Sequence, residues 1–524
     1  MKKVISIIAF SLACLLSVTS CKKKDKDLSG IDVHAEENAI HFDSTKIAGF
    51  FSKYPDFKQF QPEINELYKK HDYHYIWYDR DGLIEFAEVL FDKVNQIKSE
   101  GVQNQIPYKE QINDLFYEAK EKSDPDLSSE LLISSMYFFY AKNVLHGIDP
   151  KESRETGWYL PREKGSYVSY LDTLMKDPNL LKKDDSELMP LYYNLKKGLQ
   201  HYREIEKKGG WGTIEMEAGV KSLKPGDSSK TIAQVRKRLF VSGDLSKDSG
   251  KSQFDEELLQ GLTSYKKRNA REMDNLITPD LIKHLNVSVQ DRIKSIVVNM
   301  ERCRWISTDY TKDGEYIAVN IPSYRVRYFK DGKVKLESNV VVGKEMNKTV
   351  VFSGQMSYLV FSPYWNIPKS IIEKEIKPGM AKDKNYLANH NMEWNNGKVR
   401  QKPGDKNSLG LVKFMFPNSN NIYLHDSPAK SLFNKESRAF SHGCVRVEKA
   451  RDLAVAILED DKNWTPQKID KAMHAGKENS YALKKKIPVY IAYFTASADE
   501  EGNVSFFDDV YNRDSRLASL LYKQ

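Results

Sequence analysis

The hydrophobic period of this chain changes near residue 305, and that change constrains the fold more than any other feature. Before it, apolar residues recur every three to four positions, as in amphipathic helices. After it, EYIAVNIPSYRVRYFKDGKVKLESNVVVGK (315–344) alternates apolar and polar residues around an Asp-Gly hairpin signal. Because 524 residues exceed what one hydrophobic core usually supports, we expect a multidomain α+β protein, with helical domains first and a β-rich domain last.

The first half of the chain predicts two helical domains. Residues 45–215 are mainly helical in pattern and predict a scaffold domain, in which LLISSMYFFYAKNVLHGIDP (131–150) is an apolar helix ending at Gly and Pro. The aromatic stretch YHYIWY (73–78) fits either a sugar-stacking patch or core packing, and we favour core packing. Residues 216–288 carry three short helical patterns, which predict a small independent module.

The second half predicts a β-rich domain over residues 289–524. Strand-like runs recur at MSYLVFSPYW, KFMFPN, NIYLHD and IPVYIAYFTA. Between the first two, residues 366–408 form a polar segment that is too long for a simple loop. We expect this segment to fold as an inserted helical cap.

The N-terminus predicts export. MKKVISIIAFSLACLLSVTSC has two lysines and an apolar stretch too short to span a membrane, as in a signal peptide, here residues 1–20. Val-Thr-Ser-Cys at its end is similar to the bacterial lipobox, so we expect lipid on Cys21, although an ordinary secretory signal is the alternative. Residues 21–44 begin with a charged tract typical of a tether. Since lysine follows Cys21, we expect an outer-membrane anchor facing the periplasm; surface display, which the KKKDKD tract also fits, is the alternative.

The charge distribution does not favour nucleic acid. The net charge is +8, but the 81 Lys and Arg residues are spread among 73 Asp and Glu residues rather than gathered in one arm. We therefore expect no nucleic-acid partner.

Two segments of the β-rich domain carry groups for thiol chemistry. RAFSHGCVRVEKA (438–450) holds Cys444, and NIYLHDSP places His425 at a strand end 444 − 425 = 19 residues earlier. A free cysteine has a pKa of about 8.5, and a neighbouring imidazole activates it by forming a thiolate–imidazolium pair. His442 would point away from Cys444 in an extended loop, so His425 is the better base. The N–H groups of Gly443 and Cys444 suit an oxyanion hole, and Arg446 suits a substrate carboxylate.

Two other interpretations compete with a catalytic cysteine. A buried cysteine is usually inert packing, which we expect for Cys303 on its helix face. A zinc site formed by His425, His442 and Cys444 lacks any CxxC or HExxH spacing. We expect no metal and no cofactor.

The motifs SHGC and YLHD, together with SPYWNIPKSI and the closing segment from Ile487, resemble the L,D-transpeptidase catalytic domain of the YkuD fold. The order of parts is similar to the large periplasmic subfamily, which has a helical scaffold, a peptidoglycan-binding module and a capping subdomain. The three-helix pattern resembles that peptidoglycan-binding module, although YKKRNAREMDNLITP (265–279) departs from its usual sequence.

The resemblance implies roles for individual residues. Cys444 would be the nucleophile and His425 the general base, oriented by the backbone carbonyl of Asp426. Backbone N–H groups around Tyr423, Gly443 and Cys444 would hold the oxyanion. The residues implied to bind substrate are Trp365, Tyr423, Ser441, His442 and Arg446.

The resemblance also implies a reaction. Cys444 would attack a tetrapeptide donor stem of peptidoglycan, release D-alanine, and pass the acyl group to a diamino-acid amine of an acceptor stem, giving a 3-3 cross-link. The partners would be both stems and, through the lipid, a membrane; carbapenems would inhibit. Alternatives are an L,D-carboxypeptidase or a protein-to-murein attachment or detachment enzyme with the same thioester, and a non-catalytic wall-binding lipoprotein.

Overall fold

The computed structural model describes most of the chain after residue 40. The predicted signal peptide 1–20, the predicted lipidation site Cys21 and the predicted tether up to residue 40 lie outside the described residues. Among the helices that are described, none has both the length and the apolar character needed to cross a membrane. The described ranges are 41–79, 82–118, 126–162, 165–181, 188–312 and 314–522.

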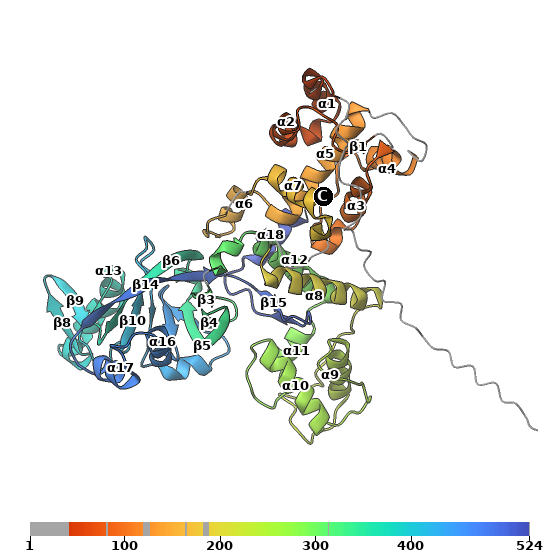
Figure 1. Ribbon diagram of the computed structural model, residues 1–524. Helices are drawn as coiled ribbons and strands as arrows, with labels where there is room; N and C mark the ends of the chain where they lie inside the picture. Colours follow the sequence, from red (N-terminus) through yellow and green to blue (C-terminus); the bar gives the residue numbers. More distant parts are fainter. Residues whose placement is uncertain are drawn as a thin grey trace, which may run out of the picture.

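The elements gather into three groups joined by two long helices (Figure 1). N-terminal helices form one group, α9 to α11 form a second, and the β-rich domain forms the third. Helices α8 (Pro190–Lys207) and α12 (Val289–Arg304) lie between them. This arrangement confirms the multidomain α+β prediction.

The N-terminal group is a helical domain with its own apolar core. The aromatic stretch 73–78 lies in this core, where Trp77 is 0 % exposed, so its rings pack rather than offer a sugar-binding surface. The carboxylate of Glu130 is also buried and accepts hydrogen bonds from the N–H groups of Ile76 and Trp77. The domain contains α1 (Ile47–Lys53), α2 (Gln61–Lys70), α3 (Glu85–Asn95), α4 (Lys109–Glu118), α5 (Leu127–Ala141), α6 (Pro150–Glu155) and α7 (Tyr167–Lys176).

Helix α8 packs with the β-rich domain, although its residues were assigned to the scaffold. Its apolar face, including Leu195 and Leu199, joins the same buried cluster as α12 and the sheet. A buried network ties α12 to the scaffold in turn, because Arg304 donates to the carbonyl of Val144 and Glu301 accepts from the N–H of Ile148. The two helices thus connect the scaffold rigidly to the β-rich domain.

The predicted three-helix module is present as α9 (Lys230–Val241), α10 (Glu256–Arg268) and α11 (Pro279–Leu285). Its core is separate from the others and includes Ile232, Leu258 and Leu285, each 0 % exposed.

The β-rich domain is built on a sheet that closes on itself. The strand order is β12-β5-β13-β11-β10-β6-β14-β3-β4, and β4 also pairs with the long strand β5. Strand β11 runs parallel to β13, and β3 runs parallel to β14, whereas most other pairs are antiparallel. The bounds are β3 (Tyr316–Asn320), β4 (Arg325–Lys330), β5 (Lys333–Gly343), β6 (Phe352–Phe361), β10 (Val412–Met415), β11 (Leu424–His425), β12 (Ala439–Ser441), β13 (Val445–Val447) and β14 (Asn479–Ala492).

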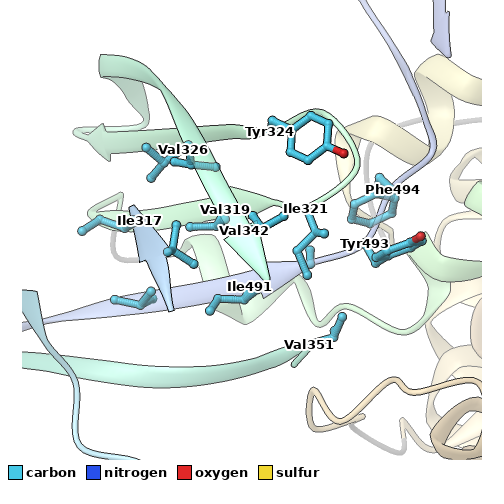
Figure 2. Packing of buried hydrophobic residues seen from close by; sticks show 14 of the residues in the cluster. Ile317, Val319, Ile321, Tyr324, Val326, Val342, Val351, Ile491, Tyr493 and Phe494 are labelled. Atoms are coloured by element: carbon cyan, nitrogen blue, oxygen red, sulfur yellow. The ribbon is translucent and has the colours of Figure 1, made fainter. Parts of the chain in front are cut away.

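Alternation along these strands builds the core. In β3 the buried residues Ile317 and Val319 alternate with half-buried neighbours. Figure 2 shows them beside Val326, Val342 and Ile491, which come from neighbouring strands. The residues between the inward-facing ones point to the opposite face of the sheet.

The insert is not purely helical as expected. It contains a three-stranded antiparallel sheet in the order β7-β9-β8, with β8 and β9 joined by a turn at Asn396-Gly397, where both residues have positive φ. An Asn-Gly pair favours such a hairpin turn, and this signal was overlooked. The elements are β7 (Trp365–Asn366), α13 (Lys369–Ile371), η8 (Ile372–Ile376), α14 (Lys377–Lys382), α15 (Tyr386–Asn389), β8 (Met392–Asn395) and β9 (Lys398–Gln401).

Candidate active site

Parallel pairing of β11 with β13 brings the two sequence motifs together. Leu424 pairs with Val445 and His425 with Arg446, and the N–H of Val445 donates to the carbonyl of Tyr423 at 3.1 Å. Leu424 and Val445 are both 0 % exposed and face the core. Because side chains alternate along a strand, the residues on either side of them face outward together. This outward set is Tyr423, His425, Cys444 and Arg446.

The imidazole of His425 is held in one tautomer. Its Nδ1 lies 2.5 Å from the carbonyl oxygen of Asp426. A carbonyl only accepts, so Nδ1 carries the proton and Nε2 keeps a free lone pair. Burial is the main cause that lowers the pKa of His425 to about 3, and the positive charge of Arg446 is the second cause. The ring is therefore neutral near neutral pH.

The sulfur of Cys444 is half-buried beside Tyr423. Its Sγ lies 3.7 Å from the carbonyl oxygen of Asn421. Burial raises the pKa of the Cys444 thiol, and hydrogen bonds from the backbone and side chain of Tyr423 oppose that shift, as do the charges of Lys413 and Arg446. Among the hydrogen bonds of the described residues, none joins Sγ to His425.

His425 and Cys444 lie on adjacent strands, offset by two positions. With strands about 4.8 Å apart and a rise of about 3.3 Å per residue, their Cα atoms are roughly 8 Å apart. The pKa directions favour a neutral thiol and a neutral imidazole. This differs from the expected thiolate–imidazolium pair, because burial disfavours both charged forms.

The loop before Cys444 is braced internally. Ser441 is 2 % exposed; its Oγ donates to the carbonyl of Cys444 at 2.6 Å and accepts from the N–H of Gly443 at 3.1 Å. Ser441 therefore shapes the loop, and its expected role in binding substrate stays a prediction. The N–H of Gly443 is likewise occupied rather than free for an oxyanion. Within the described residues, the N–H of Cys444 donates no hydrogen bond.

Arg446 and His442 lie at the same surface in different ways. Arg446 shares the outward face, and its Nε is buried with no hydrogen-bond partner among the described residues. His442 is turned toward the insert, where its Nε2 lies 3.3 Å from Oε1 of Glu375 in η8. The insert thus contacts the cysteine loop directly.

Trp365 belongs to the insert rather than to the group around Cys444. It lies in β7 and packs against the small apolar core formed by Ile367, Ile371 and Val399. No hydrogen bond or ring contact of the described residues joins it to Cys444.

Lys413 is a site residue that sequence reasoning missed. It pairs with His425 across β10 and β11, and its Nζ lies 4.7 Å from the centre of the Tyr423 ring. Burial lowers the pKa of Lys413, while Glu478 and Cys444 oppose that shift. A lysine breaking the apolar run VKFMF was the available signal, because an inward-facing charge would not be tolerated there.

The carboxylate of Asp426 anchors the strand end. It accepts from the N–H of Leu411 at 3.0 Å and from Nζ of Lys430 at 2.7 Å. Asp426 thereby holds its own carbonyl in place against the imidazole of His425. Over the described residues, no three His, Cys, Asp or Glu side chains gather in a way that could hold a metal ion.

Comparison with known proteins assigns two segments. Residues 314–469 match the family model of the L,D-transpeptidase catalytic domain, YkuD, and residues 62–199 match that of the scaffold domain. A putative L,D-transpeptidase of Haemophilus influenzae is 35 % identical over 245 residues, which are 43 % of this chain and 49 % of that protein. The match thus spans about half the length of this relative.

Similar solved structures are also L,D-transpeptidases. One from Xylanimonas cellulosilytica is 12 % identical, covers 53 % of this chain and all of its own, and has a TM-score of 0.19. Another from Mycobacterium smegmatis is 12 % identical, covers 34 % of this chain and 58 % of its own, and has a TM-score of 0.20. At such low TM-scores the assignment rests on the family models and the Haemophilus relative.

Proposed function

We propose that the protein cross-links peptidoglycan through an acyl-enzyme on Cys444, because residues 314–469 match the family model of the L,D-transpeptidase catalytic domain, YkuD. The thiol attacks the L,D bond before the terminal D-alanine of a tetrapeptide donor stem. A C–S bond forms, the C–N bond breaks, and D-alanine leaves. The side-chain amine of a diamino acid on an acceptor stem then displaces sulfur and forms a 3-3 cross-link.

The proposal depends on one observation: Cys444 and His425 face the same side of the sheet, and the imidazole of His425 is held in one tautomer. Nδ1 is bound to the carbonyl of Asp426, so Nε2 is the atom that accepts a proton. It lies on the same face as Cys444, one strand away. These are the positions that a general base and a nucleophile need for acyl transfer.

The resting charges suggest how the proton moves. Both groups are neutral before substrate arrives, so the thiol proton passes to Nε2 as sulfur attacks the carbonyl carbon. The resulting imidazolium sits next to Arg446, whose charge disfavours it. His425 therefore readily gives the proton to the departing amine. In the second step the attacking amine loses a proton to His425, and the thiolate that leaves the thioester takes up this proton.

Charge and shielding in the cleft fit a carboxylate-bearing stem peptide. Lys413 and Arg446 place two cations near Cys444 and suit the terminal carboxylate of the donor stem. The insert reaches the cysteine loop through Glu375 and His442. A thioester has to be kept from water until an amine arrives, and a cover over the loop would serve that purpose.

The remaining parts would keep the enzyme at its polymer. The signal peptide and Cys21 would deliver it to the cell envelope as a lipoprotein, anchored in the outer membrane and facing the periplasm. The three-helix module would bind peptidoglycan, and carbapenems would acylate Cys444.

The test uses purified full-length protein in detergent, incubated with a disaccharide-tetrapeptide and followed by mass spectrometry. A dimer that has lost one D-alanine is the expected product, and Cys444→Ser is the matched control that forms none. Accumulation of tripeptide without dimer would identify a carboxypeptidase instead. No turnover, together with no meropenem adduct on Cys444, would leave a non-catalytic wall-binding lipoprotein.

A further inference from the structure

The segment 507–514, which we call the C-terminal brace, is linked to the cysteine loop through Thr349 and lies outside the residues that match the catalytic family model. It follows β16 (Val504–Phe506) and leads into α18 (Asp514–Leu521), beyond residue 469 where the family match ends. Nothing in the catalytic motifs points to this segment, yet one of its side chains lies two hydrogen bonds from the residue before Cys444.

That side chain is Tyr511, which is 2 % exposed. Its hydroxyl donates to the carbonyl of Gly343 at 2.7 Å and accepts from the N–H of Thr349 at 3.1 Å. Its own N–H donates to the hydroxyl of Tyr493 at 2.7 Å, and that hydroxyl donates to Asp509 at 2.5 Å. Tyr511 is thus held by hydrogen bonds both at its hydroxyl and at its backbone N–H.

Thr349 carries the connection onward. It is 0 % exposed; its hydroxyl accepts from the N–H of Gly343 at 2.9 Å and donates to the carbonyl of Gly443 at 2.8 Å. Close packing keeps this contact tight, because a Cβ on Gly343 would lie 2.0 Å from the carbonyl oxygen of Asn347. The carbonyl of Gly443 therefore has one defined direction.

That direction sets the direction of another group. In a trans peptide the carbonyl of one residue and the N–H of the next point opposite ways. Holding the carbonyl of Gly443 against Thr349 therefore aims the N–H of Cys444 away from Thr349. This is the N–H that stays without an acceptor among the described residues, whereas that of Gly443 is bound by Ser441.

We propose that Thr349 and Tyr511 are positioning residues that aim the Cys444 N–H at the oxyanion formed during acyl transfer. The proposal rests on Cys444 being the nucleophile, as argued under the proposed function. It extends the catalytic apparatus to a buried threonine and to a tyrosine of the C-terminal brace, neither of which touches substrate.

The brace is itself held by the other domains. Asp508 forms an ion pair with Arg271 of the three-helix module at 2.6 Å, and Arg513 donates to the carbonyl of Gly157 in the scaffold region at 3.2 Å. Asp514 pairs with Arg302 of α12 at 2.7 Å. These contacts tie the segment around Tyr511 to the three-helix module, to the scaffold region and to α12.

The test compares two reactions of Cys444 in the full-length protein. Acylation by meropenem passes through an oxyanion, whereas alkylation by iodoacetamide does not. The variants are Thr349→Val and Tyr511→Phe, which remove only hydroxyl hydrogen bonds, and Thr349→Ser, which keeps them. Tyr328→Phe is the matched control, because that buried hydroxyl donates to Glu315 instead.

We expect Thr349→Val and Tyr511→Phe to slow acylation about 10- to 100-fold, less than the 10²- to 10³-fold typical of deleting an oxyanion donor. Alkylation should change less than about twofold, and Thr349→Ser and Tyr328→Phe should acylate at the wild-type rate. Unchanged acylation in both hydroxyl-free variants would overturn the proposal. So would a parallel fall in both rates, which marks a purely structural role. Failure of the wild type itself to form an adduct at Cys444 would instead refute the proposed function.

Discussion

Cys303 and Cys444 are the two cysteines in the described residues. Both have positively charged side chains nearby, but they differ in burial and in hydrogen-bond donors. Cys303 is 0 % exposed on α12, and burial raises its pKa far above the usual range although Arg302 and Arg304 lie near. Cys444 is also raised by burial, but hydrogen bonds from Tyr423 reach its sulfur and one side stays accessible. Positive charge lies near both thiols, so what distinguishes Cys444 is the Tyr423 donor at its sulfur and its partial exposure.

The largest expected effect separates the two cysteines directly. Cys444→Ser should reduce meropenem acylation below detection, by at least about 10³-fold, because the nucleophile is lost. Cys303→Ser should acylate at the wild-type rate, since its sulfur is closed off from the cleft. Intact mass spectrometry measures both. An adduct that survives in Cys444→Ser would contradict the assignment of the nucleophile.

The next effect concerns which imidazole serves Cys444. His425→Gln should slow acylation about 10²- to 10⁴-fold, the range typical of losing a general base. His442→Gln should slow it less than about tenfold, because that ring faces Glu375 of the insert. Stopped-flow acylation rates decide between them. Equal losses in the two variants would mean that the fixed tautomer of His425 has no special role.

The pH dependence of alkylation shows whether Cys444 rests as a thiol. Its pKa is raised, so the thiolate fraction should grow about tenfold per pH unit between pH 6 and 8, and iodoacetamide alkylation should rise with it. Because the pKa of His425 is lowered to about 3, acylation should not fall between pH 7 and 5, where an ordinary histidine becomes protonated. A flat alkylation profile over pH 6 to 8 would instead indicate a standing thiolate–imidazolium pair.

The smallest expected effect tests the positive charge of Lys413, which lies near Cys444 on the same face of the sheet. Lys413→Met removes a cation that stabilises the thiolate, so it should raise the pKa of the Cys444 thiol and lower alkylation at pH 7 by about tenfold or less. Lys468→Met on α17 (Pro466–Met473) is the matched control and should have no effect. A Lys413→Met protein with wild-type alkylation would show that the charge is screened at sulfur.

Local patterns predicted the domain order and the candidate nucleophile and base. Alternation after residue 315 predicted strands because one face of each strand is buried, and helical spacing predicted the three-helix module for the same reason. Both patterns record burial on a single element. A periodic pattern records that a face is buried but not which element covers it, which is why α8 was grouped with the scaffold although its apolar face joins the core cluster of α12 and the β-rich domain.

The details of the site depended on contacts between distant segments. Ser441 was expected in the cleft because it adjoins the catalytic loop, but its short side chain is used up by the backbone of that loop. Lys413 became visible only when β10 paired with β11. The insert was expected to be helical because the prediction used only its length and polarity and did not consider the Asn-Gly hairpin signal.

The sequence alone determined that a cysteine and a histidine with the right chemistry stand in the β-rich half of the chain, because motif and residue type are local properties. Tertiary structure decided which face they share, which N–H groups remain free, and that Thr349 and Tyr511 lie behind the cysteine loop. Those features depend on strand register and on hydrogen bonds between residues up to 168 positions apart, and no local pattern encodes them.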